Sequence, residues 1–484
     1  MILDAPCGQM EGLEKGGLAQ FLGIPYAKPP VGALRFRPTE ALPRWEGVRP
    51  CTKPGRAAPQ LCVPGLTSLR KEETLDEDCL YLNVTTPDVH GHAPVLFWIH
   101  AGAFQKGSGT LGIQPETFAK EGLVVVNGNY RLGALGFLDV SRWFGDDYRQ
   151  SGNNGLLDIL QALRWTRDNI AAFGGDPDNI TVMGQSAGAK ICGTLALMQA
   201  ARGLFRRAVL CSGAVQCIRS RHTAQTIADR FLAEAGLTDA DASELLTMPW
   251  ERILKAQTNL FAGLNLHTVG PVFDGVNFGA DDALALVRNG AGRDVELLIG
   301  TNRDEMNLYW HVYNVHGLDD ALAVKLFGSR APIVMGHYAK IPHDENFHKH
   351  FIHFFTEYVY RSGSLKMAEA EAEAGQRVYL YRLDWDRQAF GACHASETQF
   401  LMGFGSVIRD VDRSPAHKAL AEEMRGAFLQ FIRTGVPAAE GLPPWPAFDG
   451  ERRAMMVFDA PCRVERAPAS EVDPRMPYPI FELD

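Results

Sequence analysis

A short segment in the middle of the chain constrains the fold more than any other. Residues 180–183 form an apolar, β-branched run typical of a strand, and they lead directly into Gly-Gln-Ser-Ala-Gly at positions 184–188. The mostly small residues 187–197 then favour a helix. In such a strand–turn–helix, glycines on either side of the serine relieve a steric clash, and the hydroxyl projects above the sheet. We therefore expect Ser186 to be a nucleophile, although the pentapeptide alone is a weak signal.

Strand-like and helix-like segments alternate along the whole chain. Leu156, Leu160 and Leu163 recur at helical spacing, and residues 414–433 form another amphipathic helical pattern. Several strand-like runs are continuously apolar, as expected for strands covered on both faces. We therefore predict an α/β fold, with a mostly parallel central sheet and helices on both faces. The expected strands are residues 80–84, 95–99, 123–127, 180–183, 208–211, 295–299 and 378–383.

Two long segments contain helical patterns and no strand pattern. They are residues 223–263 and residues 308–375, and the second is rich in aromatic residues and histidine. Both fit insertions that cover the mouth of a sheet and shape a pocket. We therefore interpret residues 1–484 as one domain with two helical cap segments, because α/β folds often run large as one unit.

The composition excludes several classes of function. The chain has 48 Lys and Arg against 57 Asp and Glu, a net charge of −9, which argues against nucleic acid as a partner. No apolar run approaches the roughly 18 residues needed for a membrane span. Nine cysteines without a C-x-x-C pair disfavour zinc and a disulfide framework. With no recognisable signal peptide, we expect a cytoplasmic protein, although a secreted protein without its signal would have the same sequence.

A serine nucleophile needs a histidine base and a carboxylate that orients it. In an α/β-hydrolase fold these groups follow in the order serine, acid, histidine, each on a loop after a strand. His394 comes soon after the strand-like run 378–383, in a loop of small residues, and is the expected base. The earlier run 295–299 leads to a loop with two adjacent carboxylates, Asp304 and Glu305. Only one can reach His394, and the residues alone favour neither.

The same chemistry requires backbone N–H groups aimed at the oxyanion of the intermediate. One is expected from Ala187, directly after the nucleophile. The others are expected from the glycine turn after the strand-like run 95–99, where Gly102 and Ala103 are the candidate donors. The segments predicted from local patterns thus supply all the groups of a serine hydrolase.

Five motifs follow one another along the chain: residues 21–36, 77–83, 129–137 and 169–177 and the dipeptide Trp445-Pro446. With these motifs the chain resembles the type-B carboxylesterases, the family that includes bacterial para-nitrobenzyl esterases and the cholinesterases. The resemblance implies an α/β-hydrolase fold. The family's Gly-Thr-Asn-x-Asp-Glu segment places the acid on Glu305, and its histidine after a strand falls on His394. The resemblance also implies two buried ion pairs, Arg35 with Glu77 and Arg131 with Asp176.

The chain departs from the family pattern at several positions. Relatives usually carry glutamate before the nucleophile, whereas this chain has Gln185, which removes a negative charge beside the site. Ala101 replaces the first glycine of the oxyanion turn, and Met306 replaces a glycine after the acid. Cys62 and Cys79 fall where secreted relatives form a disulfide. No Trp lies between them, which argues against a quaternary ammonium substrate.

The histidines at positions 343, 348, 350 and 353 could suggest a metal site, but a solvated face of a cap helix accounts for them more simply. We expect neither a metal nor a cofactor. The sequence therefore predicts a serine carboxylesterase that hydrolyses small to medium-sized esters through an acyl-enzyme. Two alternatives remain: a non-catalytic interaction module like some cholinesterase-like domains, and a lipase acting on longer acyl chains.

Overall fold

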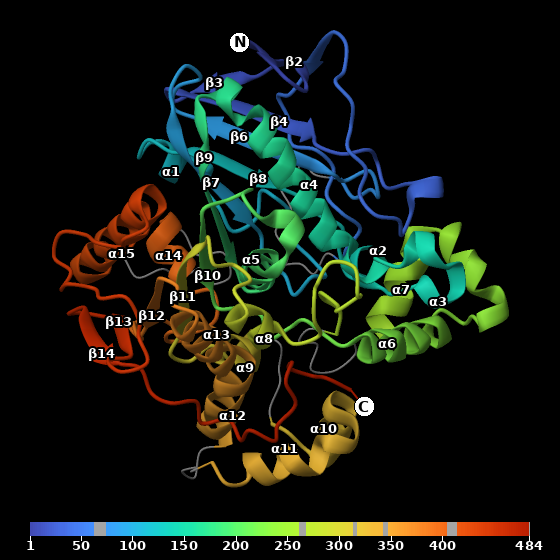
Figure 1. The fold of residues 1–484 in the computed structure, drawn as a ribbon, viewed down its shortest axis with the longest axis vertical. Helices are drawn as coiled ribbons and strands as arrows, with labels where there is room; N and C mark the ends of the chain where they lie inside the picture. The colour runs from blue at the N-terminus through green and yellow to red at the C-terminus, as the bar shows by residue number, and fades with distance from the viewer. Residues whose placement is uncertain (62–73, 261–267, 313–316, 342–346, 404–413, 484) are drawn as a thin grey trace.

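A large mixed sheet forms the centre of the computed structural model (Figure 1). The structure describes residues 1–61, 74–260, 268–312, 317–341, 347–403 and 414–483. The eleven strands have the order β14-β13-β12-β11-β10-β9-β7-β8-β6-β4-β3. The seven strands from β13 to β8 in this order run parallel to one another, and the strands at both edges pair antiparallel. The predicted α/β class is therefore confirmed. The strands are β3 (Leu13–Lys15), β4 (Leu18–Pro25), β6 (Tyr81–Thr86), β7 (Ala93–Ile99), β8 (Val124–Gly128), β9 (Gly175–Gln185), β10 (Arg207–Cys211), β11 (Glu296–Asn302), β12 (Val378–Leu383), β13 (Ala454–Phe458) and β14 (Arg463–Arg466).

Helices cover both faces of this sheet, because the side chains of its strands alternate between two apolar cores. In β7, Phe97 and Ile99 belong to one core and Leu96 and Trp98 to the other. The first core lies under α4 (Asn154–Asn169), α5 (Ala187–Leu197), α8 (Ala283–Arg288) and α13 (Ser362–Glu373). The second lies under α1 (Pro115–Ala119), α14 (Glu397–Met402) and α15 (Pro415–Thr434). A separate three-stranded sheet contains β1 (Ile2–Ala5), β2 (Gly8–Glu11) and β5 (Val48–Pro50).

The two segments expected to be caps are helical over their described residues, and no strand lies in those parts. The first contains most of α6 (Arg221–Glu234), a 3-10 helix (Asp239–Leu246) and α7 (Trp250–Leu260), which pack beside α2 (Gly133–Phe137) and α3 (Ser141–Phe144) at the right of Figure 1. The second contains most of α9 (Asn307–Val312), then α10 (Asp320–Phe327), α11 (Ala331–Tyr338), α12 (Phe347–Thr356), a π-helical turn (Glu357–Arg361) and α13. It has its own aromatic cluster, and α10 to α12 lie at the bottom of Figure 1.

One of the two expected ion pairs forms with a different partner. Arg35 does bind Glu77, with Nε donating to a carboxylate oxygen at 2.8 Å. Arg131, however, donates to Asp158 at 2.8 Å and not to Asp176. The reason is burial: Asp158 is fully buried on α4, where only a cation can compensate its charge, whereas Asp176 is partly exposed at the start of β9.

Two further sequence predictions concern the cysteines and membrane spans. Cys79 is a buried free thiol, and its expected family partner Cys62 lies outside the described residues. None of the helices in the described ranges combines the length and the apolar character that crossing a bilayer would require.

Candidate active site

The predicted elbow is a strained turn between β9 and α5. Ser186 has φ 57° and ψ −117°, a backbone conformation that a non-glycine residue adopts only under constraint. Only glycine fits at the two flanking positions, because a side chain would clash there. A Cβ on Gly184 would lie 2.3 Å from the carbonyl carbon of Gly188, and one on Gly188 would lie 2.0 Å from the oxygen of Ile99. The Ser186 N–H donates to the Cys211 oxygen at 2.8 Å, which fixes the turn to β10.

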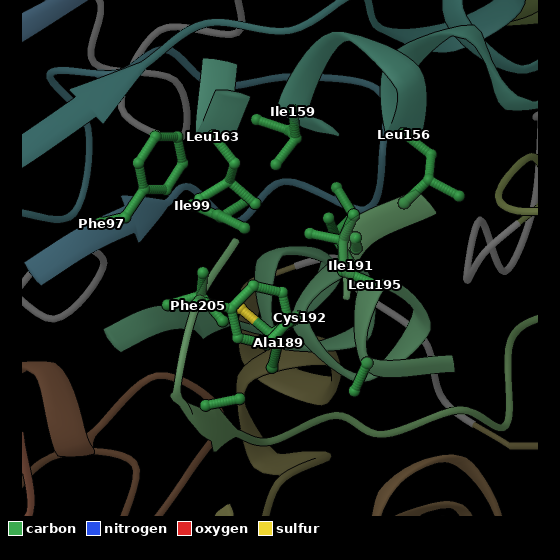
Figure 2. Close-up of a cluster of buried hydrophobic side chains, with 14 of the residues drawn as sticks. Phe97, Ile99, Leu156, Ile159, Leu163, Ala189, Ile191, Cys192, Leu195 and Phe205 are labelled. Atoms are coloured by element: carbon green, nitrogen blue, oxygen red, sulfur yellow. The ribbon is translucent and has the colours of Figure 1, made fainter. Parts of the chain in front are cut away.

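The helix behind Ser186 is held by one of the two apolar cores. Figure 2 shows side chains of α4 and α5 gathered with those of β7. Every residue of α5 is buried, so small side chains are needed where the helix meets the sheet. This packing holds Ser186 in place, because the helix that follows it cannot shift without opening the core. The labelled side chains are Phe97, Ile99, Leu156, Ile159, Leu163, Ala189, Ile191, Cys192, Leu195 and Phe205.

The turn after β7 has the geometry of an anion-binding loop. Gly102 has φ 124°, and the two residues that follow, Ala103 and Phe104, also have positive φ values of 54° and 63°. A Cβ on Gly102 would lie 1.8 Å from the Lys106 oxygen, so only glycine fits there. In the described part of the chain, nothing accepts a hydrogen bond from the N–H groups of Gly102, Ala103 or Ala187. These donors remain available to a ligand.

The structure places Glu305, and not Asp304, against His394. His394 Nδ1 lies 2.6 Å from one Glu305 carboxylate oxygen, and the Asn302 N–H donates to the other at 2.7 Å. The His394 N–H also donates to the Glu305 carbonyl oxygen at 3.0 Å. Asp304 instead pairs with Arg303 at 3.0 Å near the surface. The sequence alone favoured neither carboxylate. In the structure, Glu305 is buried beside the imidazole, whereas Asp304 is partly exposed and directed elsewhere.

Gln185 contacts the other imidazole nitrogen. Its amide nitrogen lies 3.4 Å from His394 Nε2, the atom that would accept the serine proton. Within the described residues, no hydrogen bond joins the Ser186 hydroxyl to His394. Catalytic hydrogen bonds often tighten only when substrate is bound. The departure from the family pattern at Gln185 therefore lies directly at the candidate base.

A second buried carboxylate, which the sequence reasoning missed, lies behind the first. Glu397 accepts from the Asn302 amide at 2.6 Å and from the Ser212 hydroxyl at 3.4 Å. Burial, together with the nearby charge of Glu305, raises the pKa of Glu397 to about 7. Its position three residues after His394 is the only signal in the sequence. That signal is weak, because acidic residues are common in the first turn of any helix.

Aromatic rings and buried cations complete the surroundings. The rings of Tyr309 and Tyr360, both from the second cap segment, lie 5.6 and 4.7 Å from the His394 ring. Lys190 on α5 is fully buried with its ammonium 5.3 Å from the Tyr360 ring centre. Arg219, in the segment after β10, is also buried. Neither cation was predicted, because local sequence does not show that a charged side chain is buried.

Other features lie away from this site. A cavity of about 1000 Å³ opens near the C-terminal end of α5, and none of the candidate catalytic residues lines it. In the histidine cluster, His348 packs against Trp310, His350 against Tyr338, and His353 contacts Glu471 at 2.7 Å. His343 lies outside the described residues. The described residues contain no group of three ligands that could hold a metal ion.

Comparisons with known proteins agree with this geometry. The sequence model of the carboxylesterase family matches residues 1–473. The para-nitrobenzyl esterase of Bacillus subtilis is 34% identical over 97% of both chains, and the phenmedipham hydrolase of Pseudarthrobacter oxydans is 33% identical over 94% of both. Among solved structures, a carboxylesterase of Geobacillus stearothermophilus superposes with a TM-score of 0.84 at 37% identity, covering 96% of this chain and 98% of that one. A thermophilic para-nitrobenzyl esterase superposes with a TM-score of 0.85 at 31% identity, covering 97% and 98%. The chain therefore belongs to the carboxylesterase family and is a carboxylic-ester hydrolase with the α/β-hydrolase fold.

Proposed function

We propose that the protein is a serine esterase in which Ser186, His394 and Glu305 form the catalytic triad. The 2.6 Å contact between His394 and Glu305, beside the elbow that presents Ser186, carries the proposal. The carboxylate holds the imidazole in the tautomer that leaves Nε2 free to accept a proton, and stabilises the imidazolium that follows.

Each group has a role in a two-step reaction. Ser186 Oγ attacks the ester carbonyl while His394 Nε2 accepts its proton. The N–H groups of Gly102, Ala103 and Ala187 stabilise the oxyanion, each being worth roughly 3–4 kcal/mol in comparable enzymes. His394 then protonates the leaving alkoxide, and a water molecule activated by His394 releases the acid from Ser186.

The substrates that we propose are esters of small to medium size. The two helical segments, 223–263 and 308–375, act as caps of a single domain and limit the space beside the nucleophile. Support comes from Tyr309 and Tyr360 in the second segment, whose rings both pack against the catalytic histidine. The name of one relative, a para-nitrobenzyl esterase, agrees with esters of benzyl-type alcohols.

We also propose a reducing compartment such as the cytoplasm. All eight cysteines among the described residues are free thiols, and six of them are buried. Burial raises the pKa of Cys192 and Cys211, so these thiols stay protonated and unreactive at neutral pH.

Ser186→Ala tests the proposal directly. We expect hydrolysis of 4-nitrophenyl butyrate to fall by at least about 10³-fold, since loss of the nucleophile leaves only binding and the oxyanion donors. Ser243→Ala, at an exposed serine in the first cap segment, is the matched control and should retain wild-type activity. An organophosphate should label the wild-type protein with one equivalent at Ser186. If Ser186→Ala kept near wild-type turnover, the proposal would be wrong.

A further inference from the structure

Arg219 carries a buried positive charge that its surroundings leave without a hydrogen bond. The residue is 1% exposed, and none of its three guanidinium nitrogens has a partner among the described residues. Burying an ionised group without partners is strongly unfavourable, and native proteins seldom retain such a group without a function. Arg35 and Arg131, which are also buried, each bind a carboxylate. Arg219 differs from both because its guanidinium has no such partner among the described residues.

The guanidinium lies beside the oxyanion turn. A Cβ placed on Gly270 would lie 3.3 Å from Arg219 Nη1 and 3.1 Å from a ring carbon of Phe104. The Arg219 guanidinium and the Phe104 ring therefore both lie next to Gly270. Phe104 directly follows Gly102 and Ala103, the proposed oxyanion donors. Arg219 thus lies near a side chain of the turn that carries the proposed oxyanion donors.

The backbone around Arg219 is fixed, so its position does not depend on the side chain finding a partner. The Arg219 N–H donates to the Pro271 oxygen at 2.9 Å, and the Phe273 N–H donates to the Arg219 oxygen at 2.9 Å. These bonds form a short parallel bridge with Val272. A side chain held in this way is preorganised, which lowers the entropy cost of binding a ligand.

A second cation reinforces the positive charge on this side of the nucleophile. Lys190 lies one helical turn after Ser186, and its N–H donates to the Ser186 oxygen at 3.0 Å. Burial, and to a lesser extent the charge of Arg219, lower the pKa of Lys190 to about 7. The two cations are therefore close enough to interact, and near neutral pH Lys190 is partly protonated.

The groups around Arg219 do not balance this charge. The charge of Glu482 acts on it, but the Glu482 oxygens accept from the Ser220 N–H at 3.2 and 3.3 Å, and no ion pair with Arg219 forms among the described residues. Burial raises the pKa of the Cys217 thiol and of the Tyr358 hydroxyl, so both are neutral at pH 7. Among the described residues, Glu482 is thus the one carboxylate whose charge acts on Arg219, and it forms no ion pair with the guanidinium.

We propose that Arg219 binds a carboxylate on the acyl part of the ester, so that the preferred substrates are monoesters of dicarboxylic acids. The planar guanidinium matches a carboxylate with two parallel hydrogen bonds. The acyl side is favoured because Arg219 lies beside the oxyanion turn, whereas the leaving alcohol must lie near His394 and its two tyrosine rings. Gln185 fits the same preference, since a glutamate there would repel an anionic substrate. The inference rests on the proposed esterase function.

The test is a ratio of two kcat/KM values. The substrates are the 4-nitrophenyl monoester of adipic acid and 4-nitrophenyl hexanoate, which have the same chain length and differ in the terminal carboxylate. We expect the wild-type enzyme to favour the adipate ester by about tenfold or more, and Arg219→Met to lower this ratio by roughly 10- to 100-fold, the range for a hydrogen-bonded charge. Arg252→Met, at an exposed arginine on α7, should keep the wild-type ratio. A wild-type ratio of one or less, or an unchanged ratio in Arg219→Met, would overturn the inference.

Two further measurements make the result unambiguous. Arg219→Lys keeps the charge but loses the planar fork, and should give an intermediate ratio. A second substrate pair, 4-(hexanoyloxy)benzoate and phenyl hexanoate, carries the carboxylate on the alcohol, and a preference confined to this pair would contradict the acyl-side assignment. If Ser186-dependent hydrolysis of the hexanoate ester occurs without a preference for the adipate ester, only this inference fails. If neither ester is hydrolysed, the proposed function fails with it.

Discussion

The two buried charge clusters near the nucleophile differ in how fully they are hydrogen-bonded. Behind His394, both oxygens of Glu305 accept hydrogen bonds, and Glu397 accepts from Asn302 and Ser212. On the other side, Arg219 has no hydrogen-bond partner for its guanidinium among the described residues. Charges whose hydrogen bonds are satisfied within the protein hold a geometry, whereas a buried charge without them is prepared for a ligand. On the two proposals above, the first cluster would serve the reaction and the second the choice of substrate.

The largest effect should come from breaking the carboxylate cluster. Glu305→Gln keeps the shape of the side chain but removes the charge that stabilises the imidazolium, and we expect kcat for 4-nitrophenyl butyrate to fall by about 10³- to 10⁴-fold. Asp304→Asn is the matched control. Because Asp304 pairs with Arg303 near the surface, its loss should change kcat by less than about threefold. The opposite ranking would show that the acid is Asp304.

On the cationic side, Lys190→Met should change the pH dependence of stability. Burial lowers the pKa of Lys190 from its ordinary value of 10.5 to about 7, so between these values the folded protein binds fewer protons than the unfolded chain. The contribution of Lys190 to the stability of the wild-type protein therefore rises as the pH increases from about 7 to 10.5. We expect the variant to be more stable than wild type by about 2–4 kcal/mol near pH 6, with the difference shrinking towards pH 10. Urea unfolding at both pH values would check this, and an equal difference at both would contradict it.

We expect Glu397→Gln to have a smaller effect on stability, with the opposite dependence on pH. Burial and the charge of Glu305 raise the pKa of Glu397 from 4.5 to about 7, so between these values the folded protein binds more protons than the unfolded chain. The contribution of Glu397 to stability is therefore highest below about pH 4.5 and is lost as the pH rises through about 7. The glutamine variant should lack this decline and be more stable by about 1–2 kcal/mol near pH 8. Glu371, whose pKa burial raises to about 8, titrates in both proteins and cancels from the difference. Curves of equal slope for the two proteins would show that Glu397 does not titrate in this range.

Local patterns predicted the scaffold well, because burial and turn geometry leave periodic and compositional signals. The run 378–383 and the helix 187–197 coincide with β12 and α5. The glycines of the elbow could also be predicted, since the turn itself leaves no space for a Cβ. The candidate groups Ser186 and His394 follow from this scaffold, because each comes soon after a predicted strand.

Contacts between distant segments could not be predicted in the same way. The partner of Arg131 is Asp158 on α4 and not Asp176, and both aspartates are plausible until the helix is placed against the sheet. Lys190 and Arg219 look like surface residues, since nothing in the neighbouring sequence shows that tertiary packing covers them. Buried charges are therefore the part of this site that only the folded structure reveals.

Tyr360 lies between the two halves of the site. Its ring is 4.7 Å from that of His394 and 5.3 Å from the ammonium of Lys190, and its hydroxyl is 2.8 Å from that of Tyr309. A substitution that moves this ring alters the environment of the base and of the cation together. Changes at these positions should therefore be non-additive, since residues that share a contact are coupled. For directed evolution of this esterase, specificity and turnover are then linked traits, and libraries that vary both sides of Tyr360 at once should find combinations that stepwise mutation misses.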